Sequence, residues 1–123
     1  RLLGNLVGPL APGSFRVLRP ADATWRLDHG VLVGLLVGTE HPTVGTVAVP
    51  AGHSSVEHSH GGEELLYVTR GTLYVEAGGV EATLTRGDGF FVPAGTPHRY
   101  AAAGDAVAEA IFGVAPTYAA PSA

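Results

Sequence analysis

The chain has 123 residues, 46% of them hydrophobic and 15% charged, which is enough to fold as one domain around its own core. All seven basic residues are arginine and cysteine is absent, which excludes disulfides, thiolate metal sites, cysteine nucleophiles and Schiff-base chemistry on lysine. With a net charge of −4 and scattered arginines, the sequence offers no basic surface for nucleic acid and no attraction to an anionic membrane.

The chain starts with a segment, residues 1–13, that we interpret as an N-terminal arm or an edge strand. It lacks the basic start and apolar core of a signal peptide, which favours a cytoplasmic location. The first residue is Arg1 rather than Met, which is compatible with a chain excised from a longer product. Trp25 follows near the start of the expected fold, where it would plug one end of a barrel or mark a dimer interface.

Short strands separated by turns are predicted for the rest of the chain. Segments that are rich in β-branched and aromatic residues, and bounded by Gly, Pro or Asp, are predicted as strands at residues 31–37, 43–49, 65–68, 72–75, 80–85, 89–92 and 106–114. Strands spaced this closely predict an all-β, antiparallel sandwich or barrel. Residues 115–123 are expected to be a frayed tail, so that residues 1–123 make a single domain.

Two histidines that lie two residues apart, His58 and His60, open the segment that carries chemistry. On a strand, such residues face the same side about 6.5–7 Å apart, which leaves room for one ion between their imidazoles. The Gly61-Gly62 pair permits a reversal, after which a second strand brings a carboxylate opposite the histidines. Both Glu63 and Glu64 fit that role, because the residues that alternate with either of them are apolar.

A further histidine, His98, follows a short strand at residues 90–92 and a stiff turn that starts at Pro93 and ends at Pro97. His98 is expected to open the next strand. Tyr100 would then lie on the same face as His98. It is a candidate acid or base in the pocket, or else a core aromatic residue whose hydroxyl is satisfied at the rim.

These residues resemble the two motifs of the cupin superfamily. The first motif consists of glycine, five residues, His-x-His, three or four residues, Glu, six residues and glycine, and its matches are Gly52, His58, His60, Glu64 and Gly71. The resemblance selects Glu64 over Glu63, because Glu63 would leave only two residues after the second histidine.

The second motif consists of glycine, five residues, Pro-x-Gly, two residues, His, three residues and Asn, and its matches are Gly87, Pro93, Gly95 and His98. Ala102 stands where the asparagine usually is, and that asparagine is not a metal ligand in the family. The resemblance implies a cupin, or jelly-roll, β-barrel. It also implies one divalent metal ion held by His58, His60, Glu64 and His98.

Three imidazoles and one carboxylate accept zinc, iron, manganese or nickel, so the ligand set does not select one ion. Four protein ligands leave open positions on the metal, as a catalytic or ligand-binding ion requires. The remaining histidines are interpreted as surface residues of turns: His29, His41 and His53. Arg70 and Arg99 are expected to be solvated, with Arg99 facing away from His98.

The expected function is that of a metal-dependent enzyme acting on a small organic molecule by isomerisation, cyclisation or dioxygenation. The metal would act as a Lewis acid on a carbonyl, enol or carboxylate oxygen, or would activate O₂ if it is Fe(II). The apolar interior favours an aromatic or polyketide-like substrate over a sugar. The alternatives are a ligand-sensing domain of a transcription regulator, and a module of a larger biosynthetic enzyme such as an N–N bond-forming synthetase. A homodimer formed through an edge strand is also expected.

Overall fold

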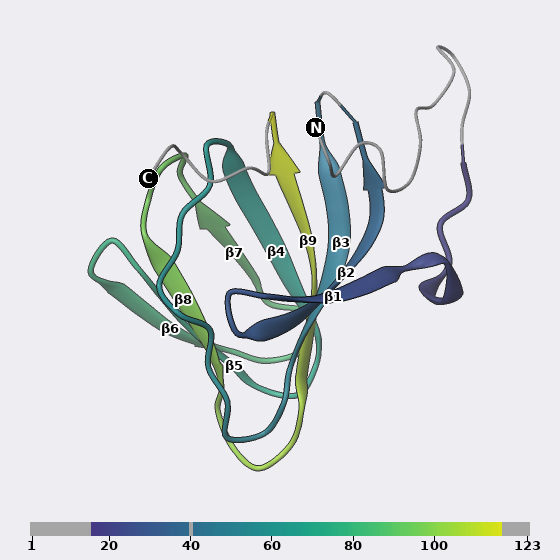
Figure 1. The fold of residues 1–123 in the computed structure, drawn as a ribbon. Helices are drawn as coiled ribbons and strands as arrows, with labels where there is room; N and C mark the ends of the chain where they lie inside the picture. Colours follow the sequence, from purple (N-terminus) through teal and green to yellow (C-terminus); the bar gives the residue numbers. More distant parts are fainter. Residues whose placement is uncertain (1–15, 40, 117–123) are drawn as a thin grey trace.

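The computed structural model describes residues 16–39 and 41–116, which form two antiparallel sheets around a shared apolar interior (Figure 1). The larger sheet has six strands in the order β1-β2-β3-β9-β4-β7, and the smaller has three in the order β6-β5-β8. The strand bounds are β1 Thr24–Asp28, β2 Val31–Gly38, β3 Thr43–Val49, β4 Glu63–Arg70, β5 Leu73–Ala77, β6 Val80–Leu84, β7 Gly89–Val92, β8 His98–Ala102 and β9 Ala108–Ala115. The prediction of an all-β, antiparallel jelly-roll barrel is therefore confirmed.

Helical structure in the described ranges is limited to one short 3-10 turn, η1, at Pro20–Asp22. Only Ala23 separates this turn from β1. None of the described helical structure is long and apolar enough to cross a membrane.

Strict alternation along the strands separates the inside of the barrel from the outside. On β4, Glu64, Leu66 and Val68 are buried, whereas Leu65 and Tyr67 are about half exposed. Because successive side chains of a strand point to opposite faces, one face of each sheet can supply the core while the other faces out. The core contains side chains of both sheets, so burial of these apolar residues holds the sheets together.

Two glycines allow close approaches that the fold requires. At Gly45 on β3, a Cβ atom would lie 2.6 Å from the carbonyl oxygen of Gly34 and 2.9 Å from the ring of Phe112. Gly71, the last glycine of the first motif, has φ +74°, and a Cβ there would lie 2.2 Å from the carbonyl oxygen of Val107. Gly71 is thus required both by its left-handed backbone and by the chain that crosses over it.

Two features of the fold differ from the sequence-based expectation. Strand β1 (Thr24–Asp28) was not among the predicted strands, although the alternation of Trp25 and Leu27 with Arg26 and Asp28 is itself typical of a strand. His58 and His60 do not lie on a regular strand: they belong to an irregular connection between β3 and β4, in which His58 forms an isolated antiparallel bridge with His98.

The predictions for the two ends of the chain can be compared with the structure only at the residues that it describes. The arm expected for residues 1–13 lies outside the described residues, as does most of the tail expected for residues 115–123. Ala115, the first residue of that tail, is the last residue of β9. The single-domain organisation of residues 1–123 stays a prediction.

Candidate metal centre

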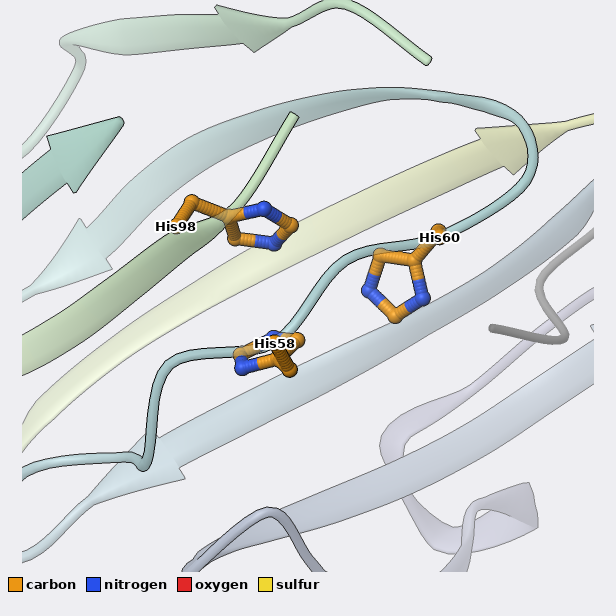
Figure 2. A group of neighbouring side chains, drawn as sticks. All are labelled: His58, His60 and His98. Atoms are coloured by element: carbon orange, nitrogen blue, oxygen red, sulfur yellow. The ribbon is translucent and has the colours of Figure 1, made fainter. Parts of the chain in front are cut away.

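Three histidines from two segments meet inside the barrel (Figure 2). His58 and His60 lie on the connection before β4, and His98 is the first residue of β8. The backbones of His58 and His98 exchange two hydrogen bonds, of 2.9 and 2.8 Å, which fix the two segments side by side. The N–H of Gly95 donates to the carbonyl of His60 at 2.8 Å, so the turn before β8 also holds this connection. One ring nitrogen from each histidine lies within 4.8 Å of the others.

Backbone carbonyl groups orient two of the three imidazoles. Nδ1 of His58 lies 2.8 Å from the carbonyl oxygen of Val56, and Nδ1 of His98 lies 2.8 Å from that of Thr96. Since a carbonyl oxygen only accepts, each Nδ1 must donate, and in the neutral ring this leaves Nε2 with a free lone pair. Such second contacts orient the histidine ligands of protein metal sites.

Glu64 brings a carboxylate to the same place from β4. Its Oε1 lies 3.1 Å from Nε2 of His98 and 3.3 Å from Nε2 of His60, and its Oε2 accepts a hydrogen bond from the hydroxyl of Tyr100. Glu64, His60 and His98 are at most 4% exposed. The neighbouring Glu63 is exposed instead, so of the two glutamates that the alternation left open, the inward one is Glu64.

Two atoms of this cluster lack a hydrogen-bond partner although they are fully buried: Oε1 of Glu64 and Nε2 of His98. An orphaned pair of this kind is costly unless something else binds it. Two atoms that bind one ion at about 2.1 Å lie roughly 3.0 Å apart at a right angle and roughly 3.4 Å apart at a tetrahedral angle. The separations of 3.1 and 3.3 Å match that range, so these residues fit a divalent metal ion.

Burial keeps His58 neutral. It lowers the pKa of this imidazole to about 4, because the charged ring is disfavoured away from water, and the hydrogen bond to Val56 offsets only part of this effect. The nearby imidazoles of His98, His29 and His60 lower the pKa further. At neutral pH, His58 therefore offers its lone pair without first losing a proton.

The pKa values of Glu64 and His98 are shifted in opposite directions. Burial alone would raise the pKa of Glu64, but the imidazoles of His60 and His98 and the hydroxyl of Tyr100 outweigh it and lower the pKa to about 2. Burial likewise opposes protonation of His98, yet the adjacent carboxylate of Glu64 raises the pKa of His98 above its usual value. The carboxylate of Glu64 therefore favours the protonated form of His98 in the metal-free protein.

A pocket that is open to solvent adjoins the imidazoles of His58 and His60. Its polar wall carries His58, His60, Glu64 and Tyr100, and its other residues are His29, Val31, Val33, Val47 and Phe112. One side of the cavity therefore presents ligand atoms, and the other presents aliphatic and aromatic surface.

His29 lines this cavity, which the interpretation as a surface turn residue did not foresee. It lies in the turn between β1 and β2 with φ +53°, and its ring stacks on that of His58 with centroids 4.2 Å apart and planes 8° apart. Its Nδ1 lies 3.2 Å from Oδ1 of Asp28, and its carbonyl accepts a hydrogen bond from the N–H of Val56. The positive φ of His29 marks it as an unusual residue, but this angle is known only once the hairpin of β1 and β2 is known, so the sequence could not reveal it.

The other singled-out side chains are placed as follows. Tyr100 is 3% exposed and points into the cavity, where its hydroxyl holds Glu64, so its role as an acid or base stays a prediction. Arg99 pairs with Glu76 at 2.9 Å and does not line the cavity. Trp25 is half exposed and packs over Gly34 on the outside of the larger sheet, so the expectation that it plugs a barrel end is wrong.

Comparison with known proteins agrees with the geometry. A family model described as a cupin domain matches residues 45–114, a range that includes all three histidines of the centre. The structure is similar to a RmlC-like cupin from Shewanella frigidimarina, with 22% identity, 84% of this chain and 92% of that chain covered, and a TM-score of 0.72. It is also similar to KdgF from Halomonas sp., with 22% identity, 82% and 94% covered, and a TM-score of 0.72.

A third similar structure is the DMSP lyase DddQ from Ruegeria pomeroyi, with 24% identity, 77% of this chain and 57% of that chain covered, and a TM-score of 0.70. At such identities, the similarity to these three structures shows the fold alone. A search of curated proteins gave no match.

Proposed function

This chain belongs to the cupin family, and we propose that it is a metal-dependent enzyme that transforms a small organic molecule in the cavity lined by His58, His60 and Glu64. The observation that carries the proposal is the buried, orphaned pair formed by Oε1 of Glu64 and Nε2 of His98. A bound cation satisfies both atoms at once.

We assign four ligands to the ion: His58, His60, Glu64 and His98. A divalent ion held there would supply Lewis-acid chemistry to a carbonyl, enol or carboxylate oxygen of the bound molecule. Tyr100 keeps Glu64 in place by donating to Oε2, which leaves Oε1 directed at the imidazoles. Zinc, iron, manganese and nickel all suit this ligand set.

The cavity wall indicates the class of substrate. An oxygen-bearing end of the molecule would lie at the imidazoles, while Val31, Val33 and Phe112 on the wall exclude water from its apolar part. His29 is placed to contact the bound molecule at the cavity edge, because Asp28 and the stack on His58 hold its ring there. A molecule with an apolar body, such as an aromatic or polyketide-like acid or ketone, fits this wall better than a free sugar.

The other functions expected from the sequence stay predictions. They are a ligand-sensing domain without turnover and a module of a larger biosynthetic enzyme. One of the similar structures, DddQ, is a lyase by name, but its low identity restricts that similarity to the fold. The argument for catalysis in this chain comes from its own cavity, in which ligand atoms adjoin a water-excluding wall.

The test begins with elemental analysis of protein purified without a nickel column. We expect a stoichiometric divalent ion, and then metal-dependent conversion of at least one member of a panel of small apolar acids and ketones, followed by proton NMR. His58→Ala should abolish both the bound ion and the conversion. His53→Ala, at an exposed histidine outside the cavity, should change neither.

His29→Asn separates the substrate contact from the metal site. Asparagine tolerates the left-handed backbone at this turn, so the hairpin is preserved. We expect the variant to keep its metal and to convert the substrate more slowly or with a higher KM. Protein that binds no divalent ion after reconstitution, or a metal-loaded protein that converts no member of the panel, would count against the proposed function.

A further inference from the structure

The turn between β1 and β2 places two polar side chains beside each other at the edge of the cavity: Asp28, the last residue of β1, and His29. The turn has two central residues, His29 and Gly30, with φ +53° and +87°. Positive φ at both central positions is the geometry of a type I′ turn, which favours asparagine or aspartate before glycine. The turn alone therefore does not account for a histidine at this position.

Three contacts fix the imidazole of His29 in place. Its ring stacks on that of His58, with centroids 4.2 Å apart and planes 8° apart. Its backbone carbonyl accepts a hydrogen bond from the N–H of Val56 at 2.9 Å, and its Nδ1 lies 3.2 Å from Oδ1 of Asp28. The side chain of His29 is 30% exposed and lines the cavity, so the ring is held at the boundary between the cavity and solvent.

Asp28 is itself held on the inner side of the barrel. Its Oδ2 lies 3.6 Å from Nη2 of Arg26, two residues earlier on the same strand. Residues two apart share a face of a strand, and the partners of Arg26 and Asp28 on β2 are Val33 and Val31, which both line the cavity. The carboxylate of Asp28 therefore lies between a guanidinium group and the imidazole of His29.

The carboxylate of Asp28 selects one tautomer of His29. An ionised carboxylate only accepts, and a neutral imidazole carries its single proton on either Nδ1 or Nε2. At 3.2 Å from Oδ1, a proton on Nδ1 is attracted, whereas a lone pair on Nδ1 would be repelled. The neutral ring is therefore protonated on Nδ1, and Nε2 keeps the lone pair with which it can contact a bound molecule.

We propose that Asp28 makes His29 a hydrogen-bond acceptor at the cavity edge, and that the pair selects molecules that carry a hydroxyl group, such as a hydroxy acid or an enol. This inference rests on the proposed function, because it concerns the molecule that is bound beside the ion. A ketone or an ionised acid without a hydroxyl offers only acceptors, and cannot donate to Nε2. His29 contacts the substrate, whereas Asp28 is a positioning residue that acts through His29.

The expected preference is moderate, because the side chain of His29 is 30% exposed and water can donate to Nε2 when the molecule does not. A site that is closed to water would reject a molecule without the hydroxyl far more strongly. One neutral hydrogen bond corresponds to roughly a 3–10-fold preference in Kd.

The tautomer can be measured without any turnover. Long-range ¹H–¹⁵N correlation spectra of the imidazole rings are recorded on the whole protein with Zn(II) at about pH 8, above the usual pKa of histidine. The signals of His29 are identified by their loss in His29→Asn. We expect the Nδ1–H tautomer in the wild type and a shift towards Nε2–H in Asp28→Ala. An Nε2–H tautomer in the wild type would overturn the inference.

A matched pair of probes measures the selection. Mandelate and its methyl ether, α-methoxyphenylacetate, share an aromatic body and a carboxylate and differ in one O–H donor. Calorimetric titration of the Zn(II)-loaded wild type should give a lower Kd for mandelate. Asp28→Ala and His29→Asn should each reduce this preference roughly 3–10-fold. Methylation also changes how the probe meets the ion, but it does so equally in the wild type and the variants.

Glu57→Ala is the control for the lost negative charge. Glu57 lies next to His58 but is exposed and does not line the cavity, so the preference for mandelate should persist. Retained metal content and an unchanged far-UV spectrum show that each variant is folded.

The outcomes separate this inference from the proposed function. If the loaded wild type binds both probes and neither Asp28→Ala nor His29→Asn changes the preference, the inference is overturned while the cavity remains a binding site. If only His29→Asn changes it, the role of Asp28 is overturned. A protein that binds neither Zn(II) nor either probe overturns the proposed function together with the inference.

Discussion

The hydroxyl of Tyr100 provides a sharp test of the proposed centre, because it can be removed without disturbing the packing. It donates to Oε2 of Glu64, and the two residues are only 3% and 4% exposed, so water does not readily replace the lost bond. Tyr100→Phe keeps the ring in the core. It deletes the donor to the buried carboxylate of Glu64.

The expected magnitude follows from this position. A partner that holds a metal ligand typically contributes about 10–100-fold to metal affinity, which corresponds to about 1.4–2.7 kcal/mol. An unpaired buried acceptor costs about 1–3 kcal/mol of the free energy of unfolding. Tyr100→Phe should therefore raise the Kd for Zn(II) about 10–100-fold, and should destabilise the metal-free protein by about 1–3 kcal/mol.

The Kd is measured by competition with a chelator of known affinity, and the free energy of unfolding by urea titration of the metal-free protein. Tyr74→Phe is the control, because Tyr74 lies on the smaller sheet beside Arg99 and does not line the cavity. A Tyr100→Phe variant that binds Zn(II) as tightly as the wild type would refute the reasoning. Tyr100 would then be a packing residue, and Glu64 would need no support.

Three further predictions concern the ligands and the fold. His98→Ala should leave far less than one ion per chain by elemental analysis, and should remove the rise in melting temperature that metal gives the wild type. His41→Ala should do neither. Equal metal content in the two variants would contradict the ligand assignment. Metal binding at pH 6.5 should release more than half a proton from His98, whose pKa is raised above its usual 6.5, and almost none from His58, whose pKa is about 4. Calorimetry in buffers of different ionisation enthalpy measures this release, which should fall towards zero as the pH rises through the pKa of His98; a release that grows with pH would show that the sign is wrong. Gly71→Ala should lower the free energy of unfolding by more than the about 1–2 kcal/mol of left-handed strain, because its Cβ would also meet a backbone carbonyl at 2.2 Å. Gly79→Ala, at φ +82° with no atom nearby, should lower it by the strain alone. Equal urea midpoints for the two variants would refute the steric argument.

The convergence of His58, His60 and His98 was predicted through the resemblance to the two cupin motifs, and the structure brings the three imidazoles together. That they hold a metal ion stays a prediction. The choice of Glu64 over Glu63 was not available from alternation, since either register places apolar residues behind the carboxylate. Only the motif spacing separated them, and the structure shows Glu64 buried and Glu63 exposed.

His29 could not be found in this way, because its position depends on a long-range contact. The hairpin of β1 and β2 places the turn over the connection that carries His58, where the carbonyl of His29 accepts from the N–H of Val56 at 2.9 Å. No pattern near His29 encodes that contact. Strand β1 itself was missed although Trp25 and Leu27 alternate with Arg26 and Asp28, which pair at 3.6 Å on the inward side of the strand.

The outward side chains of the larger sheet could not be placed from the sequence. Leu65, Tyr67 and Phe91 are ordinary strand residues, and their exposure follows only once Glu64, Leu66 and Val92 are known to face inward. Trp25 could not be placed for the same reason. It packs over Gly34 on the outside of the larger sheet, and the expectation that it marks a dimer interface stays a prediction.

Two consecutive residues of β4 provide a test of the ligand assignment with a matched control. Glu64 faces the imidazoles and Leu65 faces outward beside Gly113 and Phe91, because side chains alternate along a strand. Glu64→Gln removes the charge at the proposed centre and should lower the affinity for Zn(II), measured by competition with a chelator. Leu65→Gln, on the outward face, should leave this affinity unchanged. Equal metal affinity in the two variants would contradict the assignment of Glu64 as a ligand.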